Sequence, residues 1–418
     1  MNALPHPASG HSAPDEAPAL ALCRLELSDF RCYRRAEIAV PAKPVVLFGP
    51  NGAGKTNLLE AISFLAPGRG LRRARIAEIE RRPTADAPPG PGWAVFASVS
   101  TPGGERAIGT GRDPERSSGP DRAPEDEASD RRVVRIEGAT AKGQAALAEI
   151  VHLLWLTPEM DRLFADGASE RRRFLDRIVI NFVPDHARNL AGYEQAMRER
   201  NRLLKDARMD DAWLGALEQG MAETGVAVAA ARRQVMGRLV IAAEAALGPF
   251  PIPDLALAGE TEAELAAGPA LAAEDALCRR LGASRRADAE AGRALVGPHR
   301  SDLLVQHRAK SLPASLCSTG EQKALLVALV LAAARLLKLQ RGAAPILLLD
   351  EITAHLDSQR RAALFDEIEA LGAQAWMTGT DAPLFGALGG RAAFFAVAPN
   401  PAGDGAVIRP APIPVSAA

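Results

Sequence analysis

The sequence has few cysteines and lacks any long hydrophobic segment. Its four cysteines, Cys23, Cys32, Cys278 and Cys317, form no CxxC pair, which argues against a zinc site or a disulfide framework and favours a reducing compartment. The longest apolar run, ALLVALVLAAA from Ala324, is too short to cross a bilayer. The first twenty residues contain no apolar core of a secretory signal. We therefore expect a cytoplasmic protein with no membrane partner.

Aromatic residues are scarce and neither sign of charge dominates. Aromatics make up 4% of the chain, and 50 basic against 51 acidic residues give a formal net charge of -1. This balance excludes a uniformly basic nucleic-acid binder, and it leaves few aromatic platforms for single-stranded bases. DNA contact would need local patches, which taken alone are most simply solvated faces. The candidates in LRRAR and ERRR are Arg72, Arg73, Arg75, Arg171, Arg172 and Arg173.

The hydrophobic pattern is that of an α/β protein with a helical second part. The segment PVVLF predicts a short buried strand, and KTNLLEAISFL predicts the helix after it. APILLLDE and AQAWMTGTD are typical of further strands in a parallel sheet. In between, YEQAMRERNRLLKDAR and GVAVAAARRQVMGRLVIAAEAAL predict a short antiparallel helical arm. The length of 418 residues suits one large domain with a second one inserted.

These patterns divide the chain into four parts. We expect a disordered tail over 1–22, the N-terminal part of a first lobe over 23–155, a helical second lobe or arm over 156–300, and the rest of the first lobe over 301–418. A Pro- and Gly-rich insertion interrupts the first lobe at 83–130. Because WAVFASVS and RRVVRIEG flank its second half, we expect them to pair as a hairpin with the insertion at its tip.

One octet predicts a nucleotide site. The sequence between Gly49 and Thr56 fits GxxxxGK[ST] and stands between the predicted strand and helix. Such a loop presents backbone N–H groups to phosphates, its lysine reaches the β- and γ-phosphates, and its hydroxyl binds Mg²⁺. The expected nucleotide-binding residues are Gly49, Pro50, Asn51, Gly52, Ala53, Gly54, Lys55 and Thr56.

A pair of acids completes that site. Asp350 and Glu351 end the apolar strand ILLL. An aspartate there can hold Mg²⁺, and Glu351 is placed to polarise the attacking water. We therefore predict Glu351 and Lys55 as catalytic residues, with Thr56 and Asp350 as metal ligands.

A third element, CSTGEQ, precedes a strongly apolar helix. Its turn contains Ser318, Gly320 and Glu321 at a helix N-terminus, where anions bind. An ordinary N-cap is the plain alternative. One molecule does not need two γ-phosphate sites, but two molecules arranged head to tail could each close the other's nucleotide. With AHLD, which ends at Asp357, the series resembles the signature, Walker B and D-loop elements of ABC-type ATPases.

The chain resembles the RecF family in particular, bacterial recombination and repair ATPases related to SMC proteins. The similar segments are LELSDFRCY, LTPEMDRLFADGASERRRFLDR, YEQAMRERNRLLK, GRALVGPHRSDL and TGTD, in the expected order. The departures are the long tail, the insertion, Cys32 at a usual Asn, and Ser301 in place of an Asp. His299 and His355 lie within the similar segments and are most simply structural.

The resemblance implies a fold and a function. It implies an ABC-type P-loop head, a mixed sheet with helices, carrying an inserted helical lobe or short arm. It also implies ATP and Mg²⁺ as cofactors, an ATP-dependent homodimer, slow DNA-stimulated hydrolysis, and DNA binding in gap repair, single strands included. Because aromatic residues are scarce, we expect backbone contact with duplex or gapped DNA. The implied partners are RecR and RecO type mediators, which help load RecA and support the SOS response.

Two other classes of protein would also contain the loop between Gly49 and Thr56, which we call the glycine loop. The motor subunit of a membrane transporter is disfavoured by the long separation between Thr56 and Ser318 and by the lack of a switch histidine after Trp376. A small-molecule kinase would leave the Ser318 turn unexplained. Replication and repair through an ATP-gated clamp on DNA is the function that the sequence favours.

Overall fold

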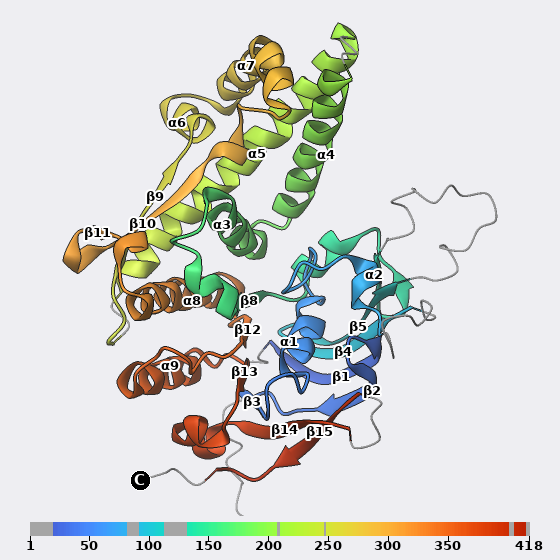
Figure 1. Ribbon diagram of the computed structural model, residues 1–418, viewed down its shortest axis with the longest axis vertical. Coiled ribbons are helices and arrows are strands. Elements are labelled where there is room, and N and C mark those ends of the chain that lie inside the picture. Colours follow the sequence, from blue (N-terminus) through green and yellow to red (C-terminus); the bar gives the residue numbers. More distant parts are fainter. Residues whose placement is uncertain are drawn as a thin grey trace, which may run out of the picture.

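The computed structural model describes residues 20–81, 92–112, 132–206, 210–245, 248–400 and 405–414. Most of the expected tail and the Pro- and Gly-rich parts of the expected insertion lie outside these ranges. Two sheets form one lobe, and long helices with a small sheet form the other (Figure 1). The predicted α/β head with a helical second lobe is therefore confirmed. Within the described ranges, no helix combines the length and apolarity needed to cross a membrane.

A largely parallel six-stranded sheet lies at the centre of the first lobe. Its order is β15-β14-β3-β13-β12-β8, with only β15 antiparallel to its neighbour. The inner strands are apolar and buried, as expected where helices cover both faces. The strands are β3 (Val45–Phe48), β8 (Leu153–Leu156), β12 (Ile346–Leu349), β13 (Ala375–Gly379), β14 (Ala393–Pro399) and β15 (Ala406–Ala411).

Helices pack on this sheet, and the N-terminal ends of some of them belong to the candidate site. α8 (Thr319–Arg341) is buried along most of its length, because its sequence is apolar nearly all round. The other elements around the sheet are α1 (Lys55–Ser63), η2 (Gln144–Glu149), η3 (Pro158–Arg162), α9 (Ser358–Leu371) and η7 (Ala382–Arg391).

A second, antiparallel sheet packs over α1. Its order is β2-β1-β4-β5-β6-β7, and its alternating apolar residues join α1 in one hydrophobic core. The elements are β1 (Ala21–Phe30), β2 (Tyr33–Ala39), α2 (Ile76–Ile79), β4 (Ala94–Thr101), β5 (Gly104–Arg112), β6 (Arg132–Ile136) and β7 (Ala139–Thr140).

The expected hairpin between WAVFASVS and RRVVRIEG is wrong. Strand β5 lies between them, pairing with β4 on one side and β6 on the other, so part of the expected insertion 83–130 is sheet. A tight turn at Pro102–Gly103 joins β4 to β5. The sequence GERAIGTGR concealed this strand because three glycines lower its intrinsic β-propensity. The first strand also begins at Ala21, within the expected tail.

The second lobe is a bundle of helices on a three-stranded sheet of order β11-β10-β9. Figure 1 shows α4, α5 and α7 side by side at the end far from the two large sheets, and their contacts agree. The elements are α3 (Ala168–Phe182), α4 (Asp185–Lys205), α5 (Asp211–Glu244), β9 (Pro253–Ala258), α6 (Glu260–Ala267), α7 (Ala270–Ala291), η4 (Pro298–Arg300), β10 (Asp302–His307), η5 (Arg308–Lys310), β11 (Leu312–Pro313) and η6 (Ala314–Leu316).

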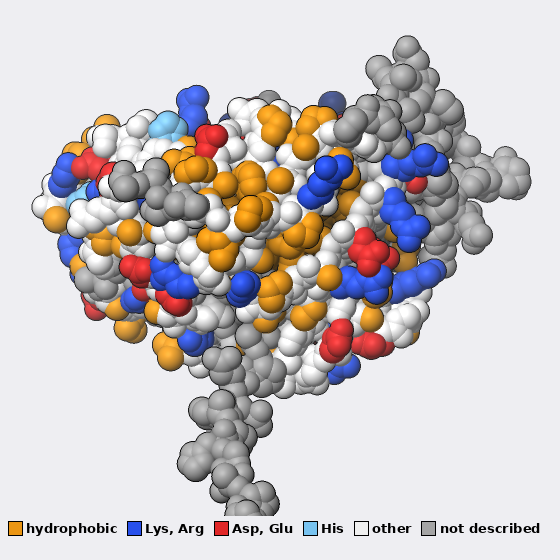
Figure 2. Space-filling view, turned by 90° about the horizontal axis from the view of Figure 1, so that it is seen from below, with side chains coloured by type: hydrophobic (Ala, Val, Ile, Leu, Met, Phe, Trp, Pro, Cys, Tyr) orange, Lys and Arg blue, Asp and Glu red, His pale blue; other side chains and the backbone are white. Residues whose placement is uncertain are grey.

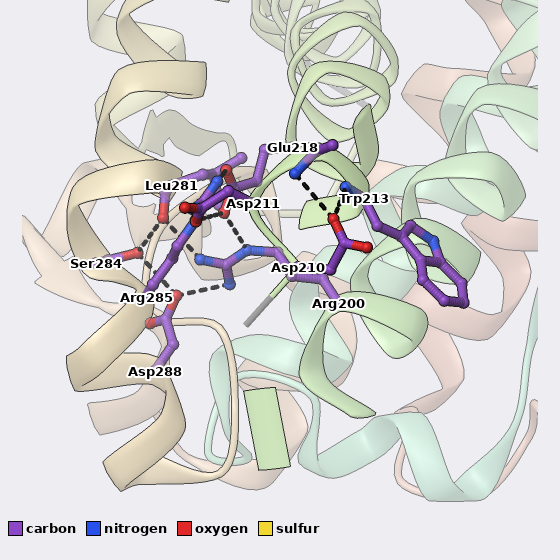
Figure 3. A network of polar contacts seen from close by, with 10 residues as sticks. Arg200, Asp210, Asp211, Trp213, Glu218, Leu281, Ser284, Arg285 and Asp288 are labelled. Atoms are coloured by element: carbon purple, nitrogen blue, oxygen red, sulfur yellow. Dashed lines mark hydrogen bonds and ion pairs between the residues drawn. The ribbon is translucent and has the colours of Figure 1, made fainter. Parts of the chain in front are cut away.

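A buried arginine joins the three helices at the end of this lobe (Figure 3). Arg200 of α4 is fully buried and bonds to Glu218 of α5 at 2.9 Å and to Asp288 of α7 at 2.7 Å. Its third bond, at 2.7 Å, goes to the Leu281 carbonyl. Arg285 also holds Glu218, so the acids share two arginines. Such satisfied charges fix how the helices pack, although their net contribution to stability is small.

Candidate nucleotide site

The glycine loop spans the end of β3 and the start of α1, and its shape requires glycine at two places. Gly49 has φ +146°, and a Cβ there would lie 2.1 Å from the Val397 carbonyl oxygen. Gly54 has φ +108°, and its Cβ would lie 2.7 Å from the Cys32 sulfur. A side chain at either position would clash and strain the backbone. The loop can therefore bring its N–H groups close to a phosphate.

Lys55 folds back over the loop. Its ammonium donates to the carbonyls of Gly49 at 2.6 Å and Pro50 at 2.9 Å. Burial lowers the pKa of Lys55, while the negative charges of Glu351 and Asp350 oppose that shift. The cation is thus held at the mouth of the loop, beside the two acids predicted to act with it.

Thr56 and Asp350 meet directly. The Thr56 hydroxyl lies 3.0 Å from both carboxylate oxygens of Asp350, which comes from the end of β12. Burial raises the pKa of Asp350, and hydrogen bonds from Thr378 and Thr56 oppose that rise. A hydroxyl and a carboxylate at one point are ligands that suit Mg²⁺ when phosphate oxygens complete the shell. The described residues contain no cluster of three or more His, Cys, Asp or Glu able to hold a metal.

Glu351 has a strained backbone. Its φ is +48°, in a left-handed region that non-glycine residues rarely adopt. Its N–H donates to the Thr378 hydroxyl at 2.8 Å, and that hydroxyl donates to Asp350 at 2.7 Å. The fully buried Thr378 therefore supports both acids. Strain of this kind often occurs at functional sites.

Thr378 was not predicted as a site residue, although the segment TGTD was noted. The available signal was its place at the end of β13, which runs parallel to β12. Because the carboxyl ends of neighbouring parallel strands meet at one edge, a hydroxyl there reaches the acids.

The Ser318 turn is a capping box. Ser318 is the N-cap of α8, and its hydroxyl and N–H lie 3.0 and 3.1 Å from the same Glu321 oxygen. Lys310 also pairs with Glu321 and is the first cause of its lowered pKa, of about 2. Ser318 is exposed, and a Cβ on Gly320 would lie 3.8 Å from the His355 carbonyl oxygen. The plain N-cap alternative is present, and the turn stands exposed beside the segment that ends at Asp357.

Asp357 caps α9. Its carboxylate accepts from the Arg360 N–H at 2.8 Å, so its observed contact is local. His355, just before it, also has a positive φ, of +62°. The structure thus brings Lys55, Thr56, Asp350 and Glu351 together, and separately places Ser318, Gly320 and the turn before Asp357 side by side.

The six candidate DNA-binding arginines do not all lie together: Arg72, Arg73 and Arg173 line one cavity, and the other three do not. Arg171 pairs with Asp302 at 2.8 Å, and Arg172 donates to the Ser301 carbonyl at 2.6 Å. Arg72 donates to Asn57 at 2.8 Å beside α1, and Arg75 begins α2. These contacts are within the protein.

Arg73 and Arg173 share one acidic partner. Their side chains are 49% and 48% exposed, and both contact Glu170 at the edge of a cavity of about 750 Å³. Among the six candidates, these two are the best placed to reach a large anionic partner.

Comparisons with known proteins agree on one family. A family model described as an AAA domain matches residues 24–87. The DNA replication and repair protein RecF of Mesorhizobium japonicum is 51% identical over 379 residues, covering 90% of this chain and 96% of that protein.

Two solved structures resemble the fold. The recombination mediator protein RecF with ATP, of the RecFOR pathway, has a TM-score of 0.75 at 20% identity, over 96% of this chain and 100% of that one. An Smc head domain with an extended coiled coil, from Pyrococcus furiosus, has a TM-score of 0.52 at 16% identity, over 94% of this chain and 96% of that one.

Proposed function

The chain belongs to the RecF family, and we propose that it is an ATP-dependent DNA-binding protein of gap repair and replication restart, which dimerises on ATP. Its relatives are named DNA replication and repair proteins. The observation that carries the proposal is the meeting of Lys55, Thr56 and Asp350 at one point, apart from the exposed Ser318 turn. A nucleotide held at the first set offers its γ-phosphate outward, where the turn of a second copy can reach it.

The residues fit ATP and Mg²⁺. Gly49 to Thr56 would cradle the phosphates, and Thr56 with Asp350 would hold the metal, which neutralises charge on the phosphates. Lys55 moves from the loop carbonyls to phosphate oxygens, exchanging two neutral acceptors for charged ones. Glu351, fixed by Thr378, accepts the proton of the attacking water.

The dimer works as a nucleotide switch. Ser318, Gly320 and Glu321 of one copy, with the turn before Asp357, would close on the nucleotide of the other. Because this contact depends on the γ-phosphate, ATP favours the closed dimer and ADP does not. Slow ATP hydrolysis then limits the lifetime of the closed dimer, and DNA stimulates this hydrolysis.

Two variants test the switch. Glu351→Gln leaves Lys55, Thr56 and Asp350 in place and removes the base, so we expect an ATP-bound dimer that persists in size-exclusion chromatography with light scattering. Lys55→Ala should abolish both dimer and hydrolysis. A Glu351→Gln protein that stays monomeric with saturating ATP would contradict the clamp.

DNA contact would come from a limited surface. The face at the bottom of Figure 1 has basic side chains scattered among acidic ones around a hydrophobic centre (Figure 2), so it offers no continuous positive track. We propose that Arg73 and Arg173, on the side of the loop after α1 and of α3, contact DNA phosphates. Such contacts are salt-sensitive and nearly blind to sequence.

The experiment that tests the function is fluorescence anisotropy of labelled duplex, gapped and single-stranded DNA, with ATP, ADP or no nucleotide. We expect tight binding with ATP alone and its loss in Lys55→Ala. Equal weak binding in all three states would contradict an ATP-gated DNA binder. Addition of RecR and RecO type proteins then tests the mediator partners that we propose, upstream of RecA loading and the SOS response.

A further inference from the structure

A cavity of about 750 Å³ lies where the loop after α1 faces the end of β8, η3 and the first half of α3. We name it the arginine cavity, because five arginines line it against three acids: Arg69, Arg72, Arg73, Arg173 and Arg177 against Glu159, Asp166 and Glu170. Its volume is within the range of ligand pockets, about 300–1,000 Å³. Only Arg72, Arg73 and Arg173 belong to the runs noted in the sequence.

Arg177 is the deepest of these cations. Its guanidinium carbon lies 4.4 Å from the centre of the Trp155 ring and 5.7 Å from that of Phe174. Among the described residues, its one hydrogen bond goes to the sulfur of Met160, at 3.6 Å. In the part of the chain that the structure describes, it has no carboxylate partner. Burial first, and then the positive charge of Arg73, lower the pKa of Arg177 to about 9.

Acids offset this charge only in part, since Arg72 also pairs with Glu60 at 3.6 Å. Glu170 contacts both Arg73 and Arg173 at the rim, and Asp166 lies 3.9 Å from the exposed Arg162. Among the described residues, Arg69 makes no hydrogen bond or ion pair. Burial and Arg173 lower the pKa of Arg73. Like charges crowded together with fewer acids than arginines are stabilised by a bound anion.

A neutral donor adds a second, independent sign of a missing ligand. Trp155 lines the cavity and is 7% exposed, and its indole N–H has no hydrogen-bond partner. A buried donor without a partner is uncommon and costs about 1–3 kcal/mol. An oxyanion beside Arg177 would supply acceptors to both groups.

We propose that the arginine cavity binds a phosphate group of a nucleic-acid strand, with Arg177 inside and Arg73 and Arg173 guiding the strand at the rim. Guanidinium groups bind phosphate oxygens in pairs, with charge-assisted hydrogen bonds. A strand fits better than a small phosphate compound because two further arginines of the same cavity, Arg73 and Arg173, are half exposed and can contact further phosphates of a strand. This inference rests on the DNA binding proposed above and gives it a particular subsite.

The test compares Arg177→Met with a matched control. Methionine keeps apolar contact with Trp155 and removes the charge. Arg188→Met removes one positive charge from α4, where the side chain is 72% exposed and pairs only with a surface acid. Anisotropy of labelled DNA is followed against salt with ATP present. We expect Arg177→Met to bind about tenfold more weakly and to reduce the salt slope by roughly one, and Arg188→Met to match the wild type.

A second variant and a second probe keep the outcomes distinct. Arg69→Met removes an exposed cation, so weaker DNA binding there supports the cavity even if Arg177→Met fails to fold. With saturating ATP present to occupy the Gly49–Thr56 loop, inorganic phosphate should raise the thermal midpoint of the wild type over chloride at equal ionic strength, but not that of Arg177→Met. If DNA does not bind and this phosphate effect persists, the function fails and the subsite takes free phosphate. If both arginine variants bind DNA like the wild type and phosphate stabilises them equally, the inference is wrong.

Discussion

Replacing Ser301 with aspartate, the residue that the family pattern carries there, should destabilise this protein. Ser301 is 1% exposed, and its hydroxyl lies 2.6 and 2.7 Å from the two oxygens of Glu262, itself 3% exposed. Arg232 lies 3.8 Å from Glu262 but is engaged by Asp176 through two bonds of 2.7 and 2.8 Å. Arg172 is likewise engaged, by the Ser301 carbonyl, so among the described residues an added carboxylate would face Glu262 without an unengaged cation.

The two carboxylates can respond in two ways, which cost different amounts of free energy. If both carboxylates stay ionised about 3 Å apart, Coulomb's law with an effective dielectric near 20 gives about 5.5 kcal/mol. If one takes a proton, the cost at pH 7 is about three pKa steps from an ordinary 3.9, or about 4 kcal/mol. The protonated pair is cheaper, so we expect a loss of about 4 kcal/mol at pH 7.

The pH dependence identifies the route. The introduced aspartate has a higher pKa in the folded state, so the folded protein binds the proton and the penalty falls as the pH falls. At pH 5 the loss should be about 1.5 kcal/mol. Urea unfolding followed by circular dichroism at both pH values measures this. A loss that is absent, or that is equal at pH 5 and 7, would refute the reasoning.

Two controls separate charge from packing. Ser301→Ala removes one hydrogen bond to Glu262 and should cost about 1–3 kcal/mol with little change between pH 5 and 7. Ser301→Asp combined with Glu262→Ser exchanges the positions of the hydroxyl and the carboxylate, leaving one acid near Arg232, and should recover most of the loss. If the double variant is no more stable than Ser301→Asp alone, the two positions do not exchange roles.

Three further predictions concern other buried groups. Arg200→Met leaves the buried Asp288 without its arginine and should cost about 3–5 kcal/mol in urea unfolding; an unchanged midpoint would contradict this. Thr378→Val frees Glu351 from its anchor and should slow ATP hydrolysis roughly tenfold or more with little change in ATP affinity, while Thr378→Ser keeps the rate. Burial lowers the pKa of His152 from 6.5 to about 4, so the unfolded chain takes the proton first as the pH falls. Stability of up to about 3 kcal/mol, present above pH 6.5, is then lost by pH 4, and His152→Gln should lessen this loss in the same assay.

The nucleotide loop was predictable because its information is local. Its motif is eight consecutive residues, although the contacts that require glycine at 49 and 54 come from Val397 of β14 and from Cys32. Asp350 and Glu351 were predictable because they directly follow an apolar strand, which places them at the carboxyl end of that strand. The fold class followed from the same patterns, since a parallel sheet joined by helices has few alternatives.

The strands that sequence did not predict depend on their neighbours. β5 contains three glycines and charged residues, yet it lies between β4 and β6 and pairs with both. β8 has only four residues, and its pairing with β12 determines it. β-Propensity largely reflects packing against neighbouring strands, so a weak sequence can form a central strand. Thr378 was missed for a similar reason, because its role needs the adjacency of β12 and β13.

Consecutive arginines in the sequence need not lie on the same surface of the folded protein. Successive residues of a helix point about 100° apart, so Arg171, Arg172 and Arg173 reach Asp302, the Ser301 carbonyl and the cavity respectively. Only the third of the run can meet an external anion at that cavity. The spacing of four to Arg177, rather than the run, places a second cation on the same face. If the cavity binds DNA phosphate, Arg173→Met and Arg177→Met should each weaken binding. Arg171→Met should instead act through stability, because it leaves Asp302 without its partner.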